Sequence, residues 1–208
     1  MSDSALSDIG FDSNGELDTT ALTTFAQGGN VTGRTWYDQG GLGYALQQLS
    51  SSAQPTIVAS GQVVTVNGKP AVDFDGSSDY MDRSTTTLFP SPKTVLTFAG
   101  VFQFDTVSSG QYVASHWFAS SDTSKQCFAL LNLATSSLRF MARFQNNTLS
   151  RVNTGSGTTA ANTQYVGVGQ FKTNHSKGDL NGTDYSDTNV NSTVNHASTG
   201  FALGHNNA

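Results

Sequence analysis

The residues of this chain best suited to chemistry are carboxylates and aromatic side chains in two polar, glycine-rich segments. The first segment begins with the tripeptide Trp36-Tyr37-Asp38, and the second contains three aspartates, Asp73, Asp75 and Asp79. Paired carboxyls can act as acid and base on a glycosidic bond. Flat aromatic faces can carry sugar rings, while aspartates in tight turns can instead accept hydrogen bonds from the backbone.

The favoured interpretation of the carboxylates is turn formation. Period-two alternation places Asp73 and Asp75 on the same face of a strand, with Phe74 pointing inward. The only glutamate is Glu16, which precedes the central part of the chain. The four histidines show no spacing typical of a zinc site, and no phosphate-binding or nucleophile-elbow motif occurs. Cys127 is the only cysteine, so no intrachain disulfide can form, and its apolar surroundings predict a buried thiol.

Most of the chain has the pattern of short β-strands. One short helix is expected near residues 18–27, capped by Asp18 and ended by Gly28-Gly29. Asn67-Gly68 predicts a hairpin between residues 62–66 and a returning strand over residues 70–75. Alternating apolar residues predict further strands over 96–104, 138–144 and 165–171, whereas 173–199 resembles long surface loops around a hairpin at Asn181-Gly182. This pattern predicts an all-β, antiparallel, two-sheet sandwich with one short helix.

Two motifs carry a family resemblance. WYDQGGLG at residues 36–43, Gln54-Pro55, and NGKPAVDFDGSSDYM at residues 67–81 follow one another in order. This order resembles the concanavalin-A-like, laminin-G-like jelly roll, and it comes nearest to the branch with the α-L-arabinofuranosidase B catalytic domain and phage tail and virion proteins. Gly40 and Leu42 depart from the Ser and Asn usual in that branch. The resemblance implies one concanavalin-A-like domain over residues 1–208.

The residues and the resemblance together give candidate sites. The ligand-binding candidates are Trp36, Tyr37, Asp38, Tyr80 and Trp117, with packing in the core or at the rim as the alternative for the aromatic residues. Because related domains bind Ca²⁺ at the rims of their sandwiches, Asp73, Asp75 and Asp79 are candidate calcium ligands, although their spacing does not match an EF-hand loop. The glutamate nucleophile of the arabinofuranosidases has no counterpart in the central strands, so we expect no catalytic residue.

Charge and hydropathy limit the partners that we expect. Charged residues make up 12% of the chain and its net charge is −5, with no basic stripe for a nucleic-acid backbone. No run approaches the roughly 20 apolar residues of a membrane helix. The N-terminus shows no secretory signal, which fits a virion protein better than a secreted enzyme.

The sequence therefore predicts a non-enzymatic phage virion protein, such as a capsid decoration, fibre or tail module, that contacts host-surface glycan. Members of the resembling family usually close with one more strand after the segment that matches residues 201–204. Either the chain is trimmed or a neighbour supplies that strand, so we expect an assembly with copies of itself or with other virion proteins. Two alternatives stay open: a glycoside hydrolase acting on arabinose-containing polysaccharide, and a carbohydrate-binding module of a larger secreted protein, which would be extracellular.

Overall fold

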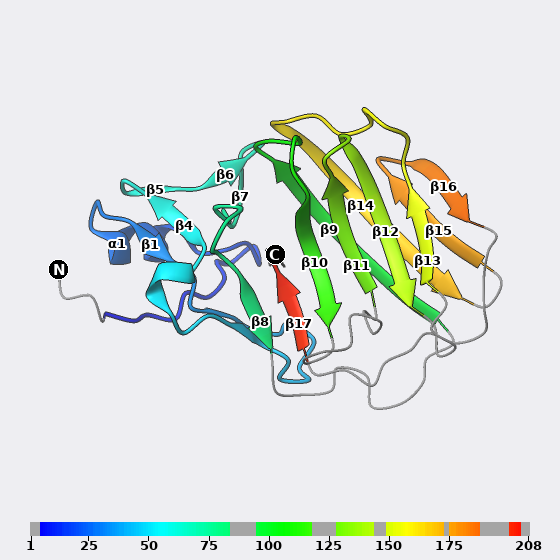
Figure 1. Ribbon diagram of the computed structural model, residues 1–208. Coiled ribbons are helices and arrows are strands. Elements are labelled where there is room, and N and C mark those ends of the chain that lie inside the picture. Colours follow the sequence, from blue (N-terminus) through cyan, green and yellow to red (C-terminus); the bar gives the residue numbers. More distant parts are fainter. Residues whose placement is uncertain are drawn as a thin grey trace.

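The computed structural model describes residues 5–83, 95–117, 128–143, 149–172, 175–187 and 200–204. Every strand pair within these ranges is antiparallel. Two sheets, of eight and four strands, form a sandwich beside a smaller N-terminal layer (Figure 1). The predicted all-β sandwich with one short helix is therefore confirmed. No helix of the described residues is long and apolar enough to cross a membrane.

The large sheet joins the two ends of the chain. Its strands, in spatial order, are β13 (Leu149–Asn153), β12 (Ser137–Arg143), β11 (Phe128–Leu133), β10 (Gln111–Trp117), β17 (Gly200–Leu203), β8 (Met81–Arg83), β3 (Leu46–Gln47) and β2 (Thr35–Trp36). The late strand β17 lies between β8 and β10. Residues near the start of the chain thereby come beside residues near its end, as expected for a jelly roll.

The small sheet covers one face of the large sheet. Its strands are, in order, β16 (Thr183–Asp187), β15 (His175–Leu180), β14 (Thr163–Lys172) and β9 (Val95–Phe104). Buried residues from both sheets form the main core, among them Phe104, Phe128, Phe140 and Phe171. The predicted strands near 96–104, 138–144 and 165–171 are confirmed as β9, β12 and β14, because alternation places their large apolar residues on this inner side.

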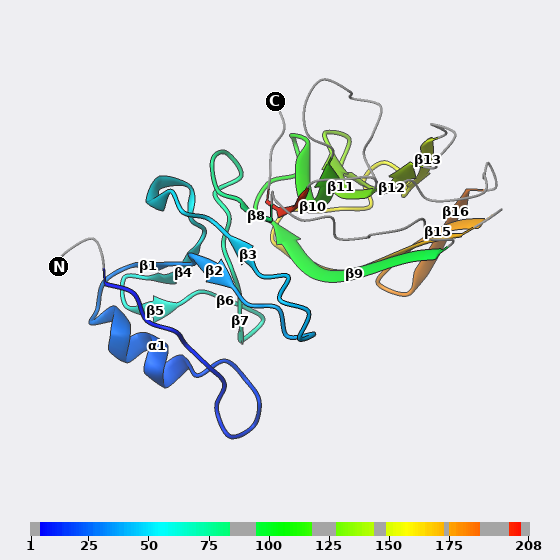
Figure 2. The same ribbon diagram turned by 90° about the horizontal axis from the view of Figure 1, so that it is seen from below.

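The N-terminal layer has its own small core. Helix α1 (Thr19–Ala26) packs Leu22 and Ala26 against Val58 of a three-stranded sheet that consists of β1 (Val31–Thr32), β4 (Thr56–Ala59) and β5 (Gln62–Val63). Asp18 caps the helix by accepting a hydrogen bond from the Ala21 backbone N–H at 2.9 Å, as predicted. A 3₁₀ turn, η1 (Ser51–Ala53), precedes β4. Figure 2 shows this layer beside the sandwich.

The hairpin predictions hold at both turns, but one strand boundary and one loop assignment were wrong. Asn67-Gly68 joins β6 (Thr65–Val66) to β7 (Lys69–Pro70), with positive φ at both turn residues. The return was expected over 70–75, yet β7 ends at Pro70, whose ring nitrogen cannot donate to a ladder. The segment expected as loops around Asn181-Gly182 instead contains β15 and β16.

Candidate functional site

A groove of about 280 Å³ brings together three of the five predicted ligand-binding residues. Trp36, Tyr37 and Asp38 line it together with Gln39, Tyr44, Leu46, Phe201 and Leu203. Trp36 is 46% exposed and Tyr37 is 52% exposed, although both are large aromatic residues. Exposed aromatic faces beside an apolar wall are suited to a ligand with one flat apolar face.

Asp38 shapes the loop that directly follows Trp36 and Tyr37. Its carboxylate accepts hydrogen bonds from the backbone N–H groups of Gly40 at 2.7 Å, Leu42 at 2.9 Å and Tyr44 at 3.0 Å. Hydrogen bonds from Tyr44 and Gly40 lower the pKa of the Asp38 carboxyl, because they favour its charged form. Residues 38–44 are thus tied to one carboxylate. The prediction that Asp38 organises its loop is confirmed, and its role in ligand binding stays a prediction.

Contacts from residues outside the loop hold the rings of Tyr37 and Tyr44. The Tyr37 hydroxyl donates to the carboxylate of Asp8 at 2.8 Å, which raises the pKa of the phenol. The guanidinium of Arg83 lies 5.1 Å from the centre of the Tyr44 ring and donates to the Gly43 carbonyl at 2.7 Å. Groups from residue 8, from the loop and from strand β8 therefore orient the aromatic rings before any ligand arrives.

The aspartate-rich segment forms a turn. The carboxylate of Asp75 accepts from the backbone N–H groups of Ser77, Ser78 and Asp79 at 2.8 to 2.9 Å and from the Ser78 hydroxyl at 2.8 Å. These bonds, led by the one from Asp79, lower the pKa of Asp75 to about 2. Asp79 in turn accepts from the Asp75 backbone N–H at 3.2 Å, and burial raises the pKa of its carboxyl. The structural interpretation of both aspartates is confirmed.

The structure does not gather the predicted calcium ligands into a metal site. Among the described residues, no group of three or more His, Cys, Asp or Glu side chains is placed to hold a metal ion. The Asp75 carboxylate is directed at the N–H groups of its own turn, and Asp79 is buried behind it. Asp73, Asp75 and Asp79 therefore do not assemble as the expected set: oxygens of Asp75 and Asp79 accept hydrogen bonds from the backbone of the turn, and the three carboxyls do not converge.

The other two ligand-binding candidates, Tyr80 and Trp117, are not found in the groove: Tyr80 lies elsewhere, and the side chain of Trp117 is not among the described residues. Tyr80 does not line the groove; its backbone N–H donates to Ala53 and its carbonyl accepts from Gln48. Trp117 ends β10 opposite Gly200, and its side chain lies outside the described residues, as does all of Cys127. Sequence reasoning missed Leu46, Phe201 and Leu203 as groove residues. Leu46 follows the loop directly on β3 and lies opposite Trp36, whereas Phe201 and Leu203 reach the groove only through the pairing of distant strands, so no local signal marks those two.

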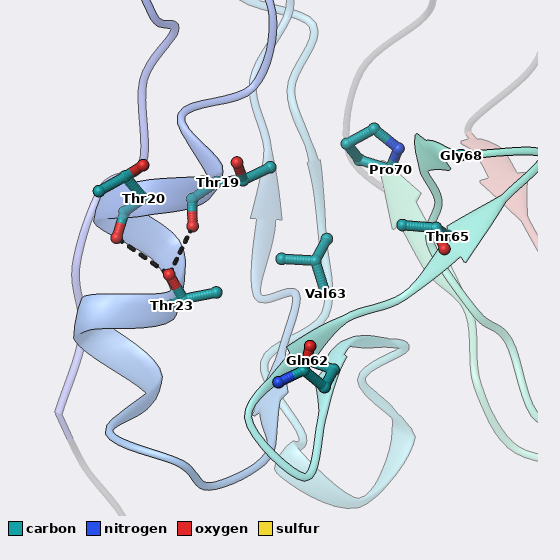
Figure 3. A pocket seen from close by; sticks show the side chains of 8 residues that line it. All are labelled: Thr19, Thr20, Thr23, Gln62, Val63, Thr65, Gly68 and Pro70. Carbon is teal, nitrogen blue, oxygen red and sulfur yellow. Dashed lines mark hydrogen bonds between the residues drawn. The ribbon is translucent and has the colours of Figure 1, made fainter.

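A second groove, of about 470 Å³, lies between α1 and the segment from β5 to β7 (Figure 3). It is lined by uncharged residues: Thr19, Thr20, Thr23, Gln62, Val63, Thr65, Gly68 and Pro70. The Thr23 hydroxyl is occupied, since it bonds to the carbonyls of Thr19 and Thr20 within the helix (Figure 3). No aromatic face lines this larger groove, so the Trp36 groove is the better candidate site.

No family model matches this chain, and no curated protein matches it. Solved structures with some similarity include domains LG4–5 of the mouse laminin α1 chain, with TM-score 0.45 and 9% identity over 74% of this chain and 42% of that one. The botulinum neurotoxin serotype D binding domain matches with a TM-score of 0.41 and 9% identity, over 77% of this chain and 43% of the neurotoxin chain. The polysaccharide lyase family 18 protein aly-SJ02 matches with a TM-score of 0.35 and 9% identity, over 70% of this chain and 64% of the lyase chain.

This chain thus spans about two-fifths of the laminin and neurotoxin chains. With TM-scores below 0.5 and identities near 10%, these similarities carry no argument about activity or ligands. The nearest branch of the family, as named from the sequence motifs, stays a prediction.

Proposed function

We propose that this protein is a non-enzymatic virion component of a phage and that it binds host-surface glycan in the Trp36 groove. The observation that carries the proposal is the pair of exposed aromatic side chains, Trp36 and Tyr37, in one groove. Sugar rings present flat C–H faces that stack on such side chains, while groove polar groups such as Gln39 can bond ring hydroxyls. The virion setting is supported by the resemblance of residues 36–81 to a branch that includes phage proteins.

The groove is better equipped for binding than for hydrolysis. Among its lining residues Asp38 is the only carboxyl, and three backbone N–H groups already occupy it. A glycosidase of the usual kind needs two carboxyl groups on either side of the scissile bond. A binding module within a larger secreted protein would use the same groove in the same way, and a longer parent chain with a signal peptide would favour that version.

The alternative is a glycoside hydrolase acting on arabinose-containing polysaccharide, with Asp73 and Asp75 as its pair of carboxyls. Burial, and then the charges of Asp105 and Asp75, raise the pKa of the Asp73 carboxyl, while the pKa of Asp75 is lowered. Carboxyls whose pKa values are driven apart are typical of acid–base pairs. Against this alternative, the Asp75 carboxylate accepts four hydrogen bonds within its own turn.

The test is binding of the purified chain to a broad glycan array, in Ca²⁺ and in EDTA. We expect binding that is unchanged by EDTA and weakened about tenfold or more in Trp36→Ala, since truncating a central aromatic contact costs at least that much. Phe11→Ala is the matched control, because Phe11 is 58% exposed and does not line the groove.

Binding that survives Trp36→Ala would overturn the site, and no binding in either buffer would overturn the glycan proposal. Loss of binding in EDTA would show that binding depends on a divalent cation, with Asp73, Asp75 and Asp79 as the candidate ligands, and would overturn the expectation of cation-independent binding. Release of reducing sugar from an arabinose-containing polysaccharide, abolished by Asp73→Asn, would establish the hydrolase instead.

A further inference from the structure

Strand β9 lies at the end of the four-stranded sheet. One side of it pairs with β14 along its whole length, from Val95 opposite Lys172 to Phe104 opposite Thr163, without a register shift. Within the described residues no strand pairs with its other side. Figure 2 shows β9 as a long curved strand of this sheet. An edge of this kind presents a row of backbone N–H and C=O groups to which another strand can bond.

The sequence of β9 lacks the usual protection of an edge strand. Its ten residues, VLTFAGVFQF, include no charged residue and no proline. At the opposite edge, β16 has five residues, and there Asp184 forms an ion pair with Lys177 at 2.7 Å. Charge and short length are the common means of preventing edge pairing. As far as the described strands go, the two edges of this sheet are therefore built differently, and of these two edge strands only β9 is long and neutral.

Apolar side chains extend from this edge onto the outer face of the sheet. Val101 is 63% exposed and Val95 is 51% exposed, both on β9. Val166 of β14, which lies directly opposite Val101, is 47% exposed. Three exposed valines on adjoining strands form an outer surface that a neighbouring strand would partly cover.

We propose that β9 pairs antiparallel with β9 of a second copy of this chain, which joins the two small sheets into one. Antiparallel pairing of a strand with itself is what a two-fold axis produces. The neutrality of β9 favours the second copy as occupant, because self-pairing then places no like charges opposite each other. With the axis near the centre of the strand, Val101 faces Thr97 or Ala99 of the other copy, and both are small enough to pack beside it.

The test is the mass of the full chain in solution, measured by sedimentation velocity across a wide range of concentrations. We expect a dimer, with a dissociation constant raised about tenfold or more in Val101→Lys, since this places two lysines near the axis. Val166→Lys is the matched control. It adds the same charge to the same face, directly opposite Val101 but one strand in from the edge, and should leave the dimer largely intact.

Amide hydrogen exchange separates loss of the interface from loss of the fold. In the wild-type dimer the β9 amides that point away from β14 should gain protection as concentration rises, whereas in Val101→Lys they should exchange quickly while β14 stays protected. A wild-type chain that is monomeric at every concentration would overturn the proposal and leave the edge for a strand of a different protein. Dimerisation that persists in Val101→Lys, or that is lost equally in Val166→Lys, would also overturn it.

Discussion

The ring of Phe140 lies directly on the backbone of Gly178. A Cβ atom at Gly178 would stand 2.4 Å from Cδ2 of Phe140, closer than such atoms ever approach. Phe140 belongs to β12 of the large sheet and is fully buried, whereas Gly178 belongs to β15 of the small sheet. Gly169 on β14 borders the same ring, with a Cβ position 3.2 Å from Phe140 Cδ1. The two sheets therefore meet where one contributes an aromatic ring and the other contributes no side chain.

We predict that Gly178→Ala destabilises the protein by about 1–3 kcal/mol, the usual cost of inserting a methyl group into a filled core. The affected ring is held on all sides, so it cannot swing aside as an exposed side chain would. Chemical denaturation followed by tryptophan fluorescence gives the free energy of unfolding.

Gly100→Ala is the control for that measurement. Gly100 lies in β9 of the same sheet, and a Cβ atom there would meet nothing within 4 Å. Its free energy of unfolding should stay within about 0.5 kcal/mol of the wild-type value. Equal destabilisation by the two alanines would show that contact with the ring of Phe140 does not decide the cost, because strand propensity alone favours alanine over glycine.

Asp75 and Asp79 occupy one turn but should respond differently to substitution. Asp75→Ala removes the acceptor of four hydrogen bonds, so we expect a loss of about 1–2 kcal/mol in the free energy of unfolding. Asp79→Asn keeps an oxygen for the Asp75 backbone N–H and removes a buried charge, so its effect should stay within about 0.5 kcal/mol. Thermal melting at neutral pH compares the two, and a larger loss in Asp79→Asn would contradict this account of the turn.

The lowered pKa of Asp75 in this turn predicts that the stability of the fold decreases in acid. The pKa of Asp75 in the folded chain is about 2, below its ordinary value of 3.8. A carboxyl whose pKa is lowered by folding binds fewer protons in the folded state, so its stabilising contribution is complete above about pH 4 and disappears as the pH falls toward 2. The raised pKa of Asp79 acts in the opposite sense, since that group favours the folded state at low pH.

Melting temperatures between pH 4 and pH 2 test this assignment. In Asp75→Asn the decline of the melting temperature over that range should be shallower than in the wild type, because the titrating group is gone. Asp79→Asn serves as the comparison and should not flatten the decline. An unchanged slope in Asp75→Asn would assign the acid sensitivity to other carboxyls.

The features that the sequence alone determined are those that neighbouring residues enforce. Asp18 caps α1 through a backbone N–H three residues away, and Asn67-Gly68 supplies the two positive φ angles of a tight hairpin. Asp75 closes its turn on N–H groups two to four residues ahead. Alternation of large apolar residues likewise marked β9, β12 and β14.

The polar strands β15 and β16 could not be predicted from alternating hydropathy. In β15 the buried positions are Ser176, Gly178 and Leu180, so the period of two is present in the structure but barely visible in hydropathy. Ser176 is buried because its hydroxyl accepts a hydrogen bond from Ser150 at 2.7 Å, and Gly178 is buried because Phe140 covers it. Both partners lie on other strands, more than 20 residues away in the sequence.

Tertiary structure alone decided the candidate site. Trp36 and Tyr37 could be singled out from the sequence, but the wall of their groove comes from Phe201 and Leu203, at the other end of the chain. These segments meet because β17 inserts between β8 and β10, and β8 in turn pairs with β3 beside the aromatic loop. Local interactions fix turns and caps within a few residues. The pairing of distant strands depends instead on burying a common core, which no single segment of the sequence encodes.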